Sequence, residues 1–125
     1  MKKTAISILI LLSFVCLAFV SCGDNYITTL GYERSDPNRQ TLRFKVIARI
    51  DGIQQYGEII DTDFNTDGHD EDVRIDNEFS VANWIAANKK IRSGQTYTIT
   101  SNVPCDVEIR FRWKGNTDKL SVSFD

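Results

Sequence analysis

The stretch that decides the fold is DVEIRFRWKGNTDKLSVSFD, residues 106–125. Apolar residues alternate with polar or charged ones on both sides of a Gly-Asn-Thr-Asp sequence at 115–118, which predicts a turn. Alternation with a period of two is typical of strands that bury one face, so the two halves predict an antiparallel hairpin. The residues expected to face the core are Val107, Ile109, Phe111, Trp113, Leu120, Val122 and Phe124.

A second hairpin is predicted over residues 42–59. The same alternation runs through 42–51, and Asp51-Gly52 fits a two-residue turn in which both central residues need positive φ. This turn would set the register of the two strands and place apolar and oppositely charged side chains opposite each other. The predicted pairs are Ile50 with Ile53, Ile47 with Tyr56, Lys45 with Glu58 and Phe44 with Ile59.

Shorter strands are predicted elsewhere. Alternation over 26–32 precedes a turn at 35–38, and residues 73–81 and 95–101 have further strand patterns. Residues 81–92 fit two alternatives, a short helix or a strand followed by a loop. For the helix, Ser80 would be the N-cap and Gly94 the stop. The residues that would share one helical face are Val81, Trp84, Ile85 and Asn88.

The pattern as a whole predicts an all-β fold. Six or seven short antiparallel strands, with turn signals at regular spacing, indicate a small antiparallel β-sandwich or a partly open barrel, with an optional short helix near 81–92. Residues 22–125 amount to 104 residues, the size of a single domain.

The N-terminus has the pattern of an export signal. Lys2 and Lys3 precede an apolar run over 5–20, which is short for a membrane-spanning helix of about 20 residues. The run ends in Phe-Val-Ser-Cys at 19–22.

This ending resembles the lipobox of bacterial lipoprotein signal peptides, in which a small residue precedes the cysteine that is acylated. Phe19 replaces the usual Leu, as in the looser spelling of the Bacteroides group. The resemblance implies a signal peptide at 1–21 and a covalent lipid such as palmitate on Cys22. It also implies a domain over 22–125 anchored to a membrane of the cell envelope, the outer membrane in particular. Ordinary signal cleavage that releases the domain is the alternative.

Charge is concentrated in one segment. The 17 acidic residues all follow Cys22, whereas Lys2 and Lys3 precede it, so residues 22–125 carry 13 basic residues and a net charge of −4. Residues 61–72, DTDFNTDGHDED, hold six acidic residues and no Lys or Arg. The remainder is therefore close to neutral, which argues against nucleic-acid binding.

Part of this acidic segment resembles the start of an EF-hand calcium loop, with Asp-x-Asn-x-Asp-Gly from position 63. Arg74 stands where a bidentate Glu is expected, and the neighbouring segments read as strands rather than helices, so a true EF-hand is excluded. Two alternatives follow: a looser Ca²⁺ loop between strands, or a solvated acidic turn. The calcium alternative takes Asp63, Asn65, Asp67 and Glu71 as ligands.

Other candidate residues have structural alternatives. With Cys22 acylated, Cys105 is the remaining thiol, either a small core residue or a reactive group. His69 is the single histidine, and a zinc site would require further His or Cys ligands. Trp84 and Tyr56 are predicted as surface aromatic contacts for a partner.

The sequence shows no catalytic signature, and three functions stay open. The first is a non-enzymatic binding or accessory module that contacts an unknown protein or glycan and is calcium-stabilised if the acidic loop binds Ca²⁺. The second is a small enzyme or thiol-dependent factor that uses His69, Cys105 or the acidic loop. The third is a purely structural envelope protein.

Overall fold

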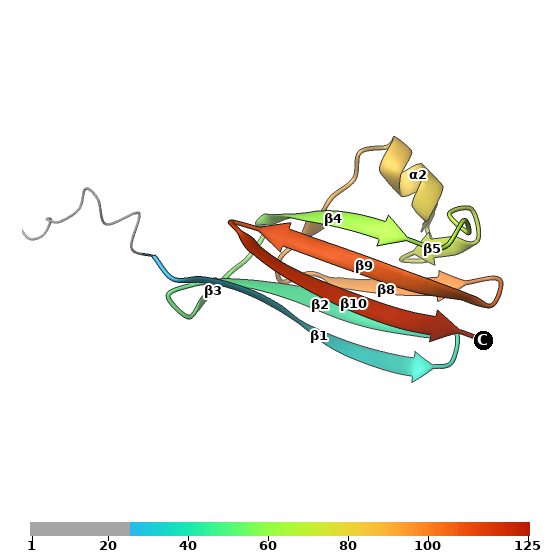
Figure 1. The fold of residues 1–125 in the computed structure, drawn as a ribbon, viewed down its shortest axis with the longest axis horizontal. Helices are drawn as coiled ribbons and strands as arrows, with labels where there is room; N and C mark the ends of the chain where they lie inside the picture. Colours follow the sequence, from blue (N-terminus) through green and yellow to red (C-terminus); the bar gives the residue numbers. More distant parts are fainter. Residues whose placement is uncertain (1–25) are drawn as a thin grey trace, which may run out of the picture.

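A computed structural model describes residues 26–125, so the predicted signal peptide and Cys22 lie outside the described residues. The fold is an all-β sandwich of two antiparallel sheets, as predicted (Figure 1). The elements are β1 (Thr28–Asn38), β2 (Thr41–Ile50), β3 (Ile53–Gln55), β4 (Ile59–Asn65), β5 (Val73–Ile75), β6 (Phe79–Ser80), α2 (Val81–Ala86), β7 (Ile91–Arg92), β8 (Thr96–Ser101), β9 (Cys105–Trp113) and β10 (Asn116–Phe124).

The two sheets enclose one hydrophobic core. The first sheet has the order β1-β2-β8-β5-β6, with β3 also paired to β2, and the second has the order β10-β9-β4-β7. Leu42, Phe44 and Val46 of β2 share this core with Ile109 and Phe111 of β9, and the rings of Phe44 and Phe111 lie 5.8 Å apart between centroids. The inward residues predicted from the C-terminal hairpin are buried, except Val122, which is half-buried.

The turn of the C-terminal hairpin is shorter than predicted. Trp113 pairs directly with Asn116, so the turn consists of Lys114 and Gly115 rather than residues 115–118. Both turn residues have positive φ, 46° and 78°, as a tight turn between twisted strands requires. The alternation therefore passes through the turn without interruption, and residues 116–118 belong to β10.

The turn at Asp51-Gly52 is confirmed, but most of the predicted hairpin is wrong. Its two residues have φ of 51° and 80°, and Ile50 pairs with Ile53. Pairing between β2 and β3 ends at Ala48, after which Gly57, with φ of 80°, turns the chain toward the second sheet. The predicted pairs of Phe44 with Ile59, Lys45 with Glu58 and Ile47 with Tyr56 do not form, because Phe44 pairs with Tyr97 and Lys45 with Thr96 of β8, and Ile59 pairs with Arg92 of β7.

A buried serine fills the gap that this crossing leaves beside β2. Ser93 is 1% exposed, and its Oγ accepts a hydrogen bond from the Ala48 backbone N–H at 2.9 Å. Its own backbone N–H donates to Glu58 O and its carbonyl accepts from Gly57 N–H, both at 2.9 Å. Ser93 therefore joins the middle of β2 to the segment that crosses between the sheets.

The helical alternative at 81–92 is correct for its first half. Ser80 caps α2, and its Oγ accepts a hydrogen bond from Asn83 N–H at 3.1 Å. The helix ends at Ala86 rather than near Gly94, because Asn88 adopts a positive φ of 55° and the chain then enters β7. The strand predicted at 73–81 consists of two short strands, β5 and β6.

The predicted turn at 35–38 is replaced by an irregular strand end. β1 continues to Asn38, with a register shift between Ser35 and Asn38, and the turn follows at Arg39 and Gln40. Pro37 lies within this shift, where its missing N–H interrupts no ladder hydrogen bond.

Side chains, rather than a backbone ladder, connect β1 to β10 on one side of the sandwich. Tyr32 OH donates to Lys119 O at 3.0 Å and Arg34 Nη1 donates to Ser121 O at 2.8 Å. On the other side lies α2 (Figure 1), and its residues Val81 and Trp84 belong to the core. Within residues 26–125, helical segments fall short of the length and apolarity needed to cross a membrane.

Candidate functional site

The acidic segment is part strand and part loop. Asp61 to Asn65 belong to β4, where Asp61 lies opposite Arg112 and Asp63 opposite Arg110 of β9. The prediction of a loop over the whole of 61–72 is therefore wrong for its first five residues. Ile60 points into the core, so the alternation that buries it directs the aspartates to the outer face.

The four predicted calcium ligands do not share one environment. Asp63 Oδ2 lies 2.8 Å from Arg112 Nη1, and this ion pair raises the pKa of the arginine. Asn65 Oδ1 accepts a hydrogen bond from Asp67 N–H at 3.0 Å, and Glu71 lies exposed in the following loop. Among residues 26–125, no group of three or more His, Cys, Asp or Glu side chains is arranged to hold a metal. Calcium binding stays a prediction that would require Asp63 to exchange its arginine partner for the ion.

The loop at 66–72 has its own hydrogen-bond network. The backbone carbonyl of His69 accepts from the N–H groups of Asp72 and Val73 at 2.9 and 3.1 Å, and Thr66 Oγ1 bonds to the Asp70 carboxylate. His69 Nδ1 lies 3.2 Å from Asp72 Oδ2, so the imidazole has a carboxylate neighbour within the loop. These contacts give the loop a defined shape at the end of β4.

The thiol and the imidazole occupy different surroundings. Cys105 is half-buried against the core, and its Sγ lies 3.4 Å from Ser101 Oγ. His69 is bonded to Asp72 instead. The packing of Cys105 agrees with its interpretation as a small apolar residue.

The two aromatic candidates have opposite exposures. Trp84 is 6% exposed, so its prediction as a surface contact is wrong. The helix directs its ring into the core, where it lies perpendicular to Tyr97 at a centroid distance of 6.1 Å. Tyr56 is 72% exposed, and its ring covers Gly94, where an added Cβ would lie 2.5 Å from Tyr56 Cδ1.

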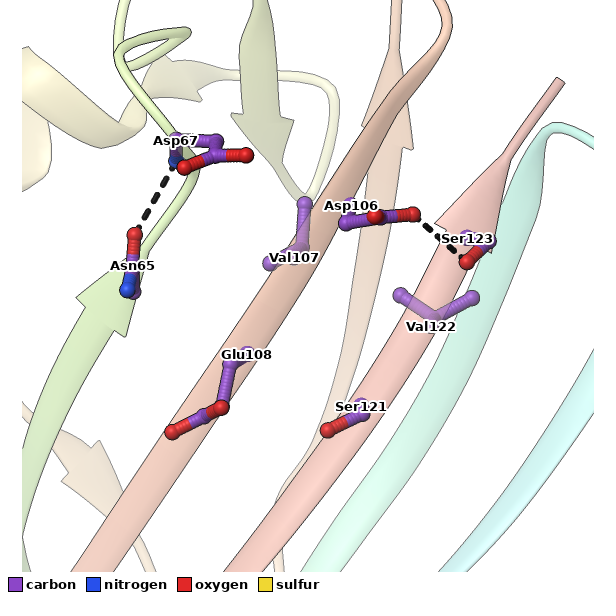
Figure 2. Close-up of a pocket in the computed structure, with 8 residues that line it drawn as sticks. All are labelled: Asn65, Asp67, Asp106, Val107, Glu108, Ser121, Val122 and Ser123. Carbon is purple, nitrogen blue, oxygen red and sulfur yellow. Dashed lines mark hydrogen bonds between the residues drawn. The ribbon is translucent and has the colours of Figure 1, made fainter.

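An open polar trough lies on the outer face of the second sheet, with a volume of about 440 Å³ (Figure 2). It extends across the ends of β4, β9 and β10 and includes the first turn of the acidic loop. Val107 of β9 and Val122 of β10 also line the trough, between its polar side chains (Figure 2). The polar residues of this trough are Asn65, Asp67, Asp106, Glu108, Ser121 and Ser123.

Hydrogen bonds position two of the trough carboxylates. Ser123 Oγ donates to Asp106 Oδ1 at 2.6 Å, a contact visible in Figure 2. Arg110 Nε donates to Glu108 Oε2 at 2.5 Å, and this hydrogen bond lowers the pKa of Glu108. The Arg110 guanidinium offsets the charge of Glu108, so Asp67 and Asp106 supply the remaining carboxylates of the trough beside its hydroxyl and amide groups.

Sequence reasoning identified only part of this trough. Asn65 and Asp67 were singled out as calcium ligands, whereas Asp106, Glu108 and the two serines belong to the outward positions of the C-terminal hairpin. Their alternation marks them as exposed, but only the pairing of Asn65 with Glu108 shows that the two groups adjoin.

Comparison with protein-family models, with curated proteins and with solved structures finds no match to this chain in any of the three. The trough, the acidic loop and the N-terminal sequence are therefore the features on which a function can be based.

Proposed function

We propose that this chain is a lipid-anchored protein of the cell envelope, held in the outer membrane through Cys22, that acts as a non-enzymatic binding or accessory module. The polar trough is its partner-binding surface. The observation that carries the proposal is the gathering of six polar side chains from three strands and a loop on one open face. An open face of this kind suits a macromolecular partner, because it contacts a ligand on one side rather than enclosing it.

The chemistry of the trough limits its partners. The carboxylates of Asp67, Asp106 and Glu108 accept hydrogen bonds, while Asn65 and the serines both donate and accept. Sugar hydroxyls and the Lys or Arg side chains of a protein satisfy such groups, whereas nucleic-acid phosphates would be repelled. The proposed partner is therefore a glycan or a basic surface of another envelope protein.

The position of the trough suits an anchored protein. The described chain begins at Tyr26, four residues after Cys22, and four residues span at most about 14 Å. The trough lies at the opposite end of the sandwich, where β4 and β10 end and β9 begins (Figure 1). A domain anchored by its N-terminus would thus present the trough away from the bilayer.

Photo-crosslinking in intact cells tests the binding surface. A photoreactive phenylalanine analogue replaces Ser121 inside the trough, and the matched control replaces Thr117, which is also exposed and outward-facing on β10. We expect a defined adduct from position 121 and none from position 117. The absence of an adduct at 121, or the same adducts from both positions, would contradict the proposal.

Metabolic labelling tests the anchor separately. We expect labelled palmitate to enter the wild-type chain, and the Cys22→Ala variant to lose both the label and its membrane association. Unlabelled wild-type protein, or a Cys22→Ala variant that remains in the membrane, would refute the lipid anchor.

A further inference from the structure

Large apolar side chains gather at one end of the sandwich without being buried. Tyr26 and Ile27 precede β1, Ile53 follows the Asp51-Gly52 turn, and Tyr56 follows β3. These four residues, here the apolar tip, are 55%, 67%, 68% and 72% exposed in chain order. Such a grouping on a small domain marks a surface that contacts another apolar phase.

The tip is held by specific contacts. Ile27 N–H donates to Asp51 Oδ1 at 3.0 Å, and Asp51 N–H donates to Ile27 O at 2.7 Å, so the start of the described chain is tied to the β2–β3 turn. The Tyr56 ring rests on Gly94, which has no side chain and a φ of +85°. The isoleucines and tyrosines are therefore presented from fixed backbone positions.

The position of the tip and the distribution of charge agree with attachment at the N-terminal end of the sandwich. The tip includes Tyr26, so it lies within about 14 Å of Cys22 along four residues of chain. Lys114, in the exposed β9–β10 turn, and Asp51, in the exposed β2–β3 turn, both lie at this end of the sandwich, so their charges offset each other (Figure 1). The acidic loop at 66–72 lies at the opposite end (Figure 1). An anionic membrane surface would repel the acidic loop, which favours approach by the end that carries the apolar tip.

We propose that the apolar tip inserts into the lipid bilayer interface beside the acyl chains of Cys22, so that the sandwich stands with its polar trough away from the membrane. This inference rests on the lipid anchor proposed above. Tyrosine suits the interface, because its ring is apolar while its hydroxyl remains hydrated. The tip thereby adds a second, orienting contact to the covalent anchor.

Depth-dependent fluorescence quenching tests this orientation. The lipidated full chain carrying Cys105→Ala is reconstituted in phosphatidylcholine–phosphatidylglycerol vesicles, and a single environment-sensitive dye is placed by Ile53→Cys or, as the control, by Ser121→Cys. Both positions are exposed, and they lie at opposite ends of the sandwich. With lipids spin-labelled near the headgroup, we expect several-fold stronger quenching and a blue-shifted emission at position 53. Thermal unfolding of each labelled variant verifies that the fold is retained.

Three outcomes would overturn the inference. Quenching at position 53 that is no stronger than at position 121 shows that the tip is not the part of the sandwich inserted in the interface. A blue shift at position 53 without lipid quenching shows that a protein, such as a second copy of the chain, covers the tip. Either result, in a chain that incorporates palmitate and floats with vesicles, leaves the anchor intact. A chain that takes up no palmitate refutes the anchor and the orientation together.

Discussion

Replacing Ser93 with alanine removes one oxygen from the point where the chain crosses between the sheets. β3 pairs with β2 only as far as Ala48, and β8 only as far as Lys45. Ala48 is thus the last residue of β2 that pairs with β3, opposite Gln55, and its N–H also donates to Ser93 Oγ at 2.9 Å. The backbone hydrogen bonds of Ser93 to Glu58 and Gly57 do not involve the hydroxyl, so the substitution isolates a single interaction.

The expected cost follows from burial. Ala48 is fully buried, so no water replaces the lost hydrogen bond, and a typical intramolecular hydrogen bond contributes about 0.5–1.5 kcal/mol. In a domain of about 100 residues each kcal/mol corresponds to roughly 4–8 °C, so a central value of about 1 kcal/mol lowers Tm by roughly 4–8 °C. That loss is smaller than the usual free energy of unfolding of about 5–15 kcal/mol, so the Ser93→Ala variant should remain folded.

Two measurements check this prediction. Thermal and urea unfolding give the loss of stability, and amide hydrogen exchange reports whether the Ala48 N–H loses protection. Ser121→Ala is the control, because this serine is exposed and its loss should change stability by no more than about 0.5 kcal/mol. If Ser93→Ala unfolds like Ser121→Ala and Ala48 stays protected, the hydrogen bond from Ala48 N–H to Ser93 Oγ adds nothing to stability and the reasoning is wrong.

Four further predictions follow from other contacts. Tyr32→Phe keeps the ring against Phe111 but removes the hydroxyl bond to Lys119 O, and urea unfolding should show a loss of about 0.5–1 kcal/mol; no loss would mean that water replaces the bond. Gly94→Ala should lower the free energy of unfolding by at least about 1 kcal/mol, because alanine is strained at this positive φ and its Cβ would also clash with the Tyr56 ring. Adding Tyr56→Ala removes the clash and should restore only that part of the stability. Complete restoration would contradict the strain at positive φ. Burial raises the pKa of Tyr97 above its ordinary value of 10.0, so its contribution to stability is full below that pH and is lost as pH rises through the raised pKa. Urea unfolding midpoints of the wild type should therefore fall at alkaline pH, and those of Tyr97→Phe should fall less. The variant also leaves Arg92 N–H without its acceptor, a loss that does not depend on pH. If the acidic loop binds calcium, adding the ion after EDTA at 100 times its Kd should stabilise the chain by about 2.7 kcal/mol, and Asp63→Ala with Asp67→Ala should abolish the shift; an unchanged Tm in the wild type would refute calcium binding.

Local patterns predicted local structure well. The alternation over residues 106–125 identified the buried face of β9 and β10, and Asp51-Gly52 identified a turn that requires two positive φ values. Ser80 likewise marked the start of α2. Each of these features depends on residues close together in the chain, which is why a single sequence was sufficient to find them.

Long-range pairing was not predictable in the same way. Phe44 and Ile59 are compatible as a hairpin pair, yet Phe44 pairs with Tyr97, which is equally apolar and much farther along the chain. Alternation shows which face a residue takes, but it does not choose between two suitable partners. Nothing local distinguishes Ser93 from an exposed loop serine, because its burial arises from the meeting of three separate segments.

The candidate site shows the same division. The acidic residues were found as a cluster, but Asp63 is bound by Arg112, 49 positions later, through the pairing of β4 with β9. The trough arises from the same pairing, since Asn65 meets Glu108 only in this register. A sequence can therefore identify the polar groups of this surface, whereas the sheet determines which of them become neighbours.

The side-chain hydrogen bonds between β1 and β10 affect how readily copies of the protein can aggregate through their strand edges. Open strand edges can recruit edges of other molecules into continuous sheets, a route to aggregation. Here Tyr32 and Arg34 bind two outward carbonyls of β10, while the opposite edges are the two-residue strands β6 and β7 and the part of β4 beyond Ile60, which carries Asp61 and Asp63. Many copies confined to one surface at high density would thus meet with edges that are bound by side chains, short or negatively charged, which favours a population that stays dispersed.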